Sequence, residues 1–216
     1  MFFPIGDDQV KGGSFPLFSY GFIVLNVIVF FMQLSSESNL MEYASVPSEI
    51  VGGNNFHTVI TSMFLHGGWM HLLWNMLFLW IFADNIEATI GNFNFLLFYL
   101  LGGVAATLAH IYFNSQSSIP MVGASGAISA VLGAYIVMFP RSRVKTFFLF
   151  FFINIPAFVF LGIWIVQQTV NGISSVGEQN VGGGGVAWWA HIGGFLFGAI
   201  VGFYLKNAYP DRSLHQ

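Results

Sequence analysis

The sequence contains no cysteine, which excludes disulfide bonds, thiolate metal ligands and a cysteine nucleophile. Charged side chains are also scarce, because Asp, Glu, Lys and Arg make up only 7% of the 216 residues, and six of them are Lys or Arg. A soluble globule of this size needs far more surface charge, and nucleic-acid binding needs many cations on one face. We therefore expect a membrane protein that contacts the lipid bilayer and has no nucleic-acid partner.

Apolar residues are abundant instead, since the hydrophobic fraction is 56% and 26 residues are phenylalanine. A helix needs about 20 apolar residues to cross a bilayer core of about 30 Å. Six segments approach this pattern, at residues 15–34, 67–83, 93–113, 123–139, 146–166 and 186–205. The sequence therefore predicts an all-α fold, a polytopic membrane protein built as one bundle of six transmembrane helices.

The basic residues predict how this bundle is oriented. With six spans, the cations all fall on one side of the membrane: Lys11, Arg141, Arg143, Lys145, Lys206 and Arg212. The positive-inside rule makes that side cytoplasmic. We expect short cytoplasmic ends at 1–14 and 206–216, one membrane domain at 15–205, and a first external loop at 35–66. Within that loop, the apolar segment 56–65 is too short to span and should lie at the membrane interface.

Four polar side chains lie near the external ends of three predicted spans, where the bilayer makes unused polar groups costly. His71 and Asn75 share one face of the second span. Ser125 begins the fourth span, and His191 lies near the start of the sixth. A serine becomes a good nucleophile only when a base accepts its proton, and neutral histidine is the usual base. This combination predicts acyl transfer.

The same region offers donors for an oxyanion, because His71, Asn75 and the unpaired backbone N–H groups at the start of the fourth span can all donate. No acidic residue accompanies either histidine at this depth, so we expect a Ser–His dyad rather than a triad. A metal site of His57, His66 and His71 is the alternative chemistry. The HExxH pattern is absent and no acidic ligand is suitably placed, so we expect no metal and no cofactor.

Small residues recur at helical spacing beside both members of the dyad. They are Gly194, Gly198 and Gly202 on the sixth span and Ser125, Ser129 and Gly133 on the fourth. Such faces allow two helices to approach closely. If the two faces meet, Ser125 and His191 come within hydrogen-bond distance.

These residues resemble the motifs of the rhomboid intramembrane serine proteases. The resemblance includes 66–75 (HGGWMHLLWN), 123–126 (GASG) and 190–198 (AHIGGFLFG). It implies an endopeptidase that cleaves the transmembrane segments of single-span or multi-span membrane proteins. As in the bacterial six-span form, the protein would lie in the inner membrane with its active site open to the extracytoplasmic side.

The resemblance also implies a role for each residue. Ser125 would be the nucleophile and His191 its general base. The implied oxyanion hole consists of His71, Asn75 and the backbone N–H of Ser125. The residues implied to pack the helices at the site are Gly126, Gly194 and Gly198. His66 and Glu87 would be structural, supporting the external loop and the inner end of the second span respectively.

The chain departs from the family pattern at two places. Many members carry Trp-Arg where this sequence has His57-Thr58, and some carry Tyr where it has Ser129. Neither change removes a catalytic group. Two other functions are alternatives: an inactive rhomboid-like protein that binds helices as an adaptor or chaperone, and a transporter or channel. In the predicted fifth span, Pro156 would weaken a Phe-rich helix and suit a lateral gate.

Overall fold

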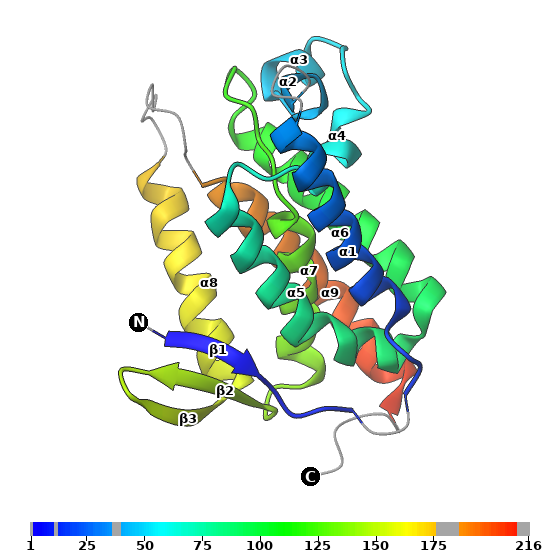
Figure 1. Cartoon of the computed structure of the whole chain (residues 1–216), viewed down its shortest axis with the longest axis vertical. Helices are drawn as coiled ribbons and strands as arrows, with labels where there is room; N and C mark the ends of the chain where they lie inside the picture. Colours follow the sequence, from blue (N-terminus) through cyan, green and yellow to red (C-terminus); the bar gives the residue numbers. More distant parts are fainter. Residues whose placement is uncertain (1, 11–12, 36–39, 176–185, 211–216) are drawn as a thin grey trace.

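The computed structural model describes residues 2–10, 13–35, 40–175 and 186–210. Within these ranges, six longer helices form a bundle (Figure 1). They are α1 (Leu17–Ser35), α5 (Trp69–Ile90), α6 (Asn92–Phe113), α7 (Ser125–Met138), α8 (Ala157–Ser174) and α9 (Trp188–Ala208). Short helices lie at one end of the bundle, between α1 and α5: α2 (Leu40–Tyr43), α3 (Pro47–Val51), α4 (Thr58–Thr61) and the 3-10 helix η2 (Ser62–Phe64). The predicted interfacial segment 56–65 forms α4 and η2.

Four of the helices are long and apolar enough to cross a membrane, namely α1, α6, α8 and α9. Helix α7 is apolar but has only 14 residues. At 1.5 Å per residue it rises about 21 Å, less than the thickness of a bilayer core. The described residues thus contain four candidate spans. Helix length and hydropathy alone therefore do not confirm the six spans predicted from the sequence.

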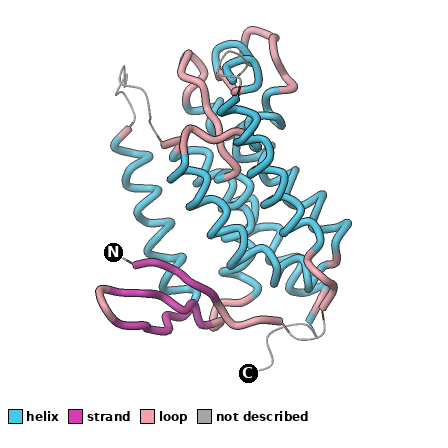
Figure 2. The backbone as a smooth tube through the Cα atoms, viewed as in Figure 1, coloured by secondary structure: helices cyan, strands magenta, loops and turns pink. Residues whose placement is uncertain are grey.

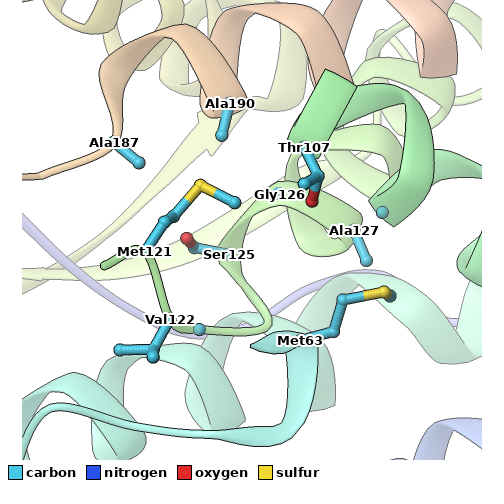
Figure 3. A pocket seen from close by; sticks show the side chains of 11 residues that line it. Met63, Thr107, Met121, Val122, Ser125, Gly126, Ala127, Ala187 and Ala190 are labelled. Carbon is cyan, nitrogen blue, oxygen red and sulfur yellow. The ribbon is translucent and has the colours of Figure 1, made fainter. Parts of the chain in front are cut away.

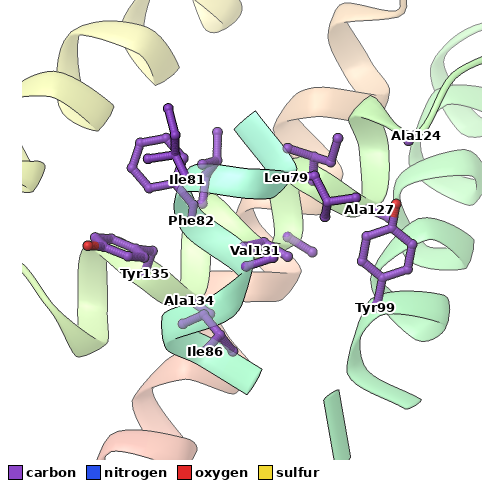
Figure 4. Close-up of a cluster of buried hydrophobic side chains, with 14 of the residues drawn as sticks. Leu79, Ile81, Phe82, Ile86, Tyr99, Ala124, Ala127, Val131, Ala134 and Tyr135 are labelled. Atoms are coloured by element: carbon purple, nitrogen blue, oxygen red, sulfur yellow. The ribbon is translucent and has the colours of Figure 1, made fainter. Parts of the chain in front are cut away.

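Helix α7 lies at the centre of the hydrophobic core. Leu79 and Phe82 of α5 and Tyr99 of α6 are fully buried in the same cluster as Val131 and Tyr135 of α7 (Figure 4). The Phe82 and Tyr135 rings meet edge to face with centroids 5.1 Å apart, a favourable arrangement for aromatic pairs. The core therefore holds α7 from several sides and fixes the position of its first residue.

Helices α7 and α9 contact each other backbone to backbone. A Cβ atom at Gly198 would overlap the carbonyl oxygen of Ala130, and one at Gly194 would overlap the carbonyl oxygen of Gly126. Only glycine permits this approach, because any side chain would push the helices apart. The two small-residue faces meet as the spacing predicts.

A three-stranded antiparallel sheet crosses the other end of the bundle (Figure 2). Its order is β1 (Phe2–Gly6), β2 (Arg143–Phe148) and β3 (Phe151–Pro156). The hairpin of β2 and β3 is therefore extended by the N-terminal strand. The prediction of an all-α fold is wrong in this part of the chain, and so is the predicted fifth span at 146–166, because α8 begins only at Ala157.

The local sequence explains why this segment forms strands. Exposed Arg143 and Lys145 alternate with buried Val144 and Thr146, which is the two-residue period of a strand. The apolar residues that follow raise the mean hydropathy of the segment, which is why the sequence predicts a membrane span there. In the structure they pair as the hairpin of β2 and β3. Pro156 ends β3 and precedes α8, so it lies at a junction and not inside a helix that it could weaken.

Candidate active site

The backbone before α7 brings Ser125 close to α5. Gly123 has φ +125°, a region that L side chains rarely adopt, and a Cβ there would lie 2.7 Å from His71 Nε2. The Gly123 N–H donates to the carbonyl oxygen of Ser62 at 2.9 Å. The turn thus packs tightly between η2 and α5, and Ser125 follows as the first residue of α7.

The structure brings Ser125 and His191 together. Nε2 of His191 lies 2.8 Å from the Ser125 hydroxyl oxygen, within hydrogen-bond distance. His191 is 9% exposed and belongs to the first turn of α9. Its ring contacts Trp188 at 6.2 Å and Trp164 of α8 at 5.9 Å between ring centroids. The imidazole is therefore buried among aromatic rings with one nitrogen facing the serine.

The second nitrogen of His191 has a partner that the sequence did not predict. Its Nδ1 lies 2.8 Å from the side-chain oxygen of Gln168, a buried residue of α8. The predicted fifth span ended at 166, so Gln168 lay outside it. With the true bounds of α8, an adjacent pair of glutamines in an apolar helix would have been the signal. Trp164 was missed because nothing distinguishes it from the other aromatic residues.

His71 and Asn75 lie on the side of α5 that faces the turn at Gly123. His71 Nδ1 accepts a hydrogen bond of 3.3 Å from the Gly67 N–H, so the proton of the neutral ring lies on Nε2. Asn75 is 6% exposed, and within the described ranges its Nδ2 has no hydrogen-bond partner. Both side chains therefore present N–H groups toward the start of α7.

The backbone at the start of α7 offers further donors. The first helical hydrogen bond runs from the Ile128 N–H to the Ala124 carbonyl at 2.9 Å. The N–H groups of residues 125–127 precede it, so the helix itself provides them with no acceptor. Ser129 hydrogen-bonds back to the Ser125 carbonyl at 2.6 Å, so its hydroxyl is directed along α7 and not toward His191.

Ser125 borders a small pocket with a volume of about 10 Å³ (Figure 3). Such a space holds about one water molecule. The lining residues are mostly small or flexible: Met63, Gly103, Thr107, Met121, Val122, Gly123, Gly126, Ala127, Ala187 and Ala190. The pocket therefore suits a small group next to the serine hydroxyl.

The two residues expected to be structural make different contacts. The backbone N–H and carbonyl of His66 each bond to the side chain of Gln33 at 3.0 Å, which ties the loop to α1. Burial lowers the pKa of the His66 imidazole to about 4, so the ring is neutral near pH 7. Glu87 is fully buried and accepts hydrogen bonds at the start of α1.

The histidines proposed as an alternative metal site are not gathered around one point. The His66 and His71 rings lie 5.2 Å apart, but His57 packs against Tyr43 at 6.5 Å. Across the part of the chain that the structure describes, no group of three His, Cys, Asp or Glu residues could hold a metal ion.

Comparison with known proteins places these residues in a family context. A family model for the Rhomboid domain matches residues 53–208, which include both helices of the Ser125–His191 pair and helix α5. Among curated proteins, the chain is 29% identical to "Rhomboid protein 1, mitochondrial" of Saccharomyces cerevisiae over 160 residues, covering 70% of this chain and 42% of the yeast protein.

Two further relatives cover more of the chain. "Rhomboid protease GluP" of Bacillus subtilis is 29% identical over 204 residues, which are 92% of this chain and 38% of that protein. "RHOMBOID-like protein 12, mitochondrial" of Arabidopsis thaliana is 28% identical over 197 residues, 83% of this chain and 56% of that protein. The chain thus spans about two fifths to just over half of the length of these relatives.

Proposed function

Because the chain belongs to the Rhomboid domain family and is an integral membrane protein, we propose that it is an intramembrane serine endopeptidase. The observation that carries this proposal is the 2.8 Å contact between Ser125 Oγ and His191 Nε2. An inactive helix-binding adaptor would not need a buried base aimed at a serine hydroxyl. A relative named a rhomboid protease supports the same activity.

In the proposed mechanism, His191 Nε2 accepts the Ser125 hydroxyl proton while Oγ attacks the carbonyl carbon of a peptide bond. The imidazolium then gives this proton to the leaving amine as the C–N bond breaks, which leaves an acyl-enzyme. A water molecule deprotonated by the same imidazole hydrolyses the ester and regenerates the serine. The chemistry uses no metal ion and no cofactor.

The negative oxygen formed during attack needs donors that are already in place. We assign this role to Asn75 Nδ2, His71 Nε2 and the backbone N–H of Ser125. Among the described residues Asn75 Nδ2 is buried without a hydrogen-bond partner, which supports the assignment because such a donor costs free energy unless a ligand uses it. The protonation of His71 on Nε2 supports it as well.

We propose membrane proteins as the substrates. A transmembrane helix must unwind locally before its amides can be attacked, so cleavage should favour segments that contain Gly, Pro or polar residues. The small pocket beside Ser125, lined by Ala187 and Ala190, supports a small side chain next to the cut.

For the membrane arrangement, we propose the six-span form with both termini in the cytoplasm. Helices α5 and α7 would complete the four candidate spans, and Ser125 would lie below the external surface. The grouping of cations at one side of this topology supports the orientation, and a bacterial inner membrane is the location we expect.

Purified protein tests this proposal directly. A serine-directed fluorophosphonate should label the wild type at Ser125, and a panel of single-span membrane proteins should be cleaved at sites read by mass spectrometry. Ser125→Ala should abolish labelling. Both Ser125→Ala and His191→Ala should lower cleavage by about 10⁴-fold or more, as loss of a nucleophile or its base does in serine proteases.

The unfolding temperature of both variants is the control, because neither residue fills a large apolar volume. We expect it to change by no more than about 2–4 °C, which corresponds to about 1 kcal/mol for a chain of this size. Cleavage that persists in purified Ser125→Ala would disprove the mechanism. Absence of both labelling and cleavage in the folded wild type would favour the adaptor.

A further inference from the structure

Gln168 is a buried amide on a mostly apolar helix. Its exposed fraction is 6%, whereas its neighbour Gln167 is exposed. Burial of an amide costs free energy unless its groups are hydrogen-bonded, and a polar side chain inside a membrane helix is a candidate functional residue. The partner of Gln168 is Nδ1 of His191 at 2.8 Å.

This bond determines which nitrogen of His191 carries the proton. The Gln168 side-chain oxygen can only accept, so the proton of the neutral imidazole lies on Nδ1. Nε2 then keeps a lone pair toward the Ser125 hydroxyl, which is the arrangement that a general base requires. We propose that Gln168 is a positioning residue that fixes the tautomer and ring orientation of His191, an inference that rests on the proposed function.

The support for the base therefore comes from α8, which stands at the edge of the bundle (Figure 1). Trp164, one turn before Gln168, packs against His191 and also lies 6.1 Å from the ring of Phe195. Among the described residues, one side-chain hydrogen bond joins α8 to another helix, and it is the Gln168–His191 bond. A movement of α8 away from α9 would break this bond and remove one of the two hydrogen bonds that orient the imidazole.

A pair of neighbouring substitutions tests the inference. Gln168→Leu removes the acceptor, and Gln167→Leu makes the same chemical change at the adjacent exposed position. We expect kcat of Gln168→Leu to fall about 10- to 100-fold with KM changed less than about twofold, because the base is misplaced while substrate binding is kept. Gln167→Leu should retain wild-type kcat and KM.

Two further measurements separate positioning from packing. In ¹⁵N-histidine NMR, the His191 signals, assigned with His191→Ala, should show the Nδ1–H form in the wild type and a mixture of tautomers in Gln168→Leu. Gln168→Glu keeps an oxygen acceptor and should restore activity. In a plot of kcat against pH, the decline on the acidic side should occur at higher pH in this variant than in the wild type, because a carboxylate stabilises the imidazolium. The titratable groups close enough to interact with His191 are His71 of α5 and His110 of α6.

These measurements distinguish failure of the inference about Gln168 from failure of the proposed protease function. Unchanged kcat and an unchanged tautomer in Gln168→Leu would overturn the inference, and so would an equal loss of kcat in Gln167→Leu. Cleavage by Ser125→Ala would instead disprove the proposed protease, while the NMR measurement would still report on the Gln168–His191 bond.

Discussion

Helix α5 carries buried polar side chains at both ends, and the two groups differ in what they bond. Near the sheet, Glu87 accepts three hydrogen bonds of 2.6–2.8 Å from the N–H groups of Phe18 and Ser19 and the Ser19 hydroxyl. Two residues before Glu87 lies Asn85, which donates to Asp7 at 2.7 Å. At the other end, the Nδ2 donor of Asn75 has no partner within the described ranges.

Burial alone therefore does not separate the structural residues of this bundle from those that we assign to the active site. Asn75 and Asn85 are the same residue type on one helix, with exposed fractions of 6% and 1%. Both polar atoms of the Asn85 amide are hydrogen-bonded, because the nitrogen donates to Asp7 and Asp8 and the oxygen accepts from the Val10 N–H. Among the described residues the Asn75 donor is unpaired and also lies beside the turn at Gly123 that leads to Ser125, and these two observations together support its assignment to the oxyanion hole.

Substitution of each asparagine by alanine should separate the two ends. Asn75→Ala should lower kcat by about 10²–10³-fold, the cost of one oxyanion donor in a serine protease, with a smaller effect on KM. Its unfolding temperature should stay near the wild-type value, because no hydrogen bond is lost. Steady-state cleavage and thermal unfolding in one detergent measure both quantities.

Asn85→Ala is the matched control and should behave in the opposite way. It leaves Asp7 with one donor fewer and should lower the free energy of unfolding by about 1–3 kcal/mol, with kcat of the folded fraction retained. If Asn75→Ala loses stability and keeps its rate, the assignment of Asn75 to the oxyanion hole is wrong.

The contact between α7 and α9 continues along both helices away from the dyad. Substitutions along this contact therefore test how strongly the active site depends on helix packing. Gly198→Val would drive methyl groups into the backbone of Ala130. Overpacking of this kind costs about 1–3 kcal/mol. Displacing the base by about 1 Å lowers the rate on the order of 100-fold. Cleavage rate and unfolding temperature should therefore fall together.

Gly202→Val is the comparison for this effect. It meets Ala134 one turn farther from the dyad, with the closest atom 2.7 Å from its Cβ. It should reduce stability but reduce kcat less than Gly198→Val does. Full activity in Gly198→Val would show that α7 and α9 do not hold the dyad together along this face.

The smallest expected effect on kcat comes from Asp7 near the sheet, whose titration acts on stability. Burial raises the pKa of this carboxyl from 3.8 to about 7, and the negative charge of Asp84 adds to the shift. Between these values the folded chain binds a proton that the unfolded chain has released. The group therefore stabilises the fold at low pH, and this contribution is lost as the pH rises toward 7.

Asp7→Asn removes this titration. The unfolding temperature of the variant relative to the wild type should therefore increase, by about 10 °C, between about pH 4 and about pH 8. Asp8→Asn, the same change on the next residue, is the control for loss of charge. Identical pH profiles in the two variants would contradict the assignment to Asp7.

Local patterns were sufficient to predict much of the arrangement around Ser125 and His191. Both residues are polar in apolar helices, and the small residues beside them predict that α7 and α9 meet closely. The structure places the two side chains 2.8 Å apart, while their catalytic roles stay predictions. The sequence did not indicate that the Asn75 donor would be unpaired among the described residues, because this depends on whether its neighbours in the fold present a hydrogen-bond acceptor.

The sheet could not be predicted in the same way. Hydropathy does not distinguish a Phe-rich hairpin from a Phe-rich helix, and one of the two partners of β2 is β1, which lies more than 130 residues earlier in the sequence. The alternation from Arg143 to Thr146 was the local signal available. Because the fifth span was placed about ten residues too early, Gln168 lay beyond its predicted end and its bond to His191 was missed.

Pairing of β1 with β2 also has a consequence for the order of assembly during synthesis. Phe2 pairs with Phe148, which is translated 146 residues later. At about 5–20 residues per second, the first strand exists for about 7–30 s before its partner has been made. All of α7 is translated before β2, so the sheet can close only on a chain that already contains Ser125. Closure of the sheet is therefore a late folding event that joins a strand made before α1 to a hairpin made after α7.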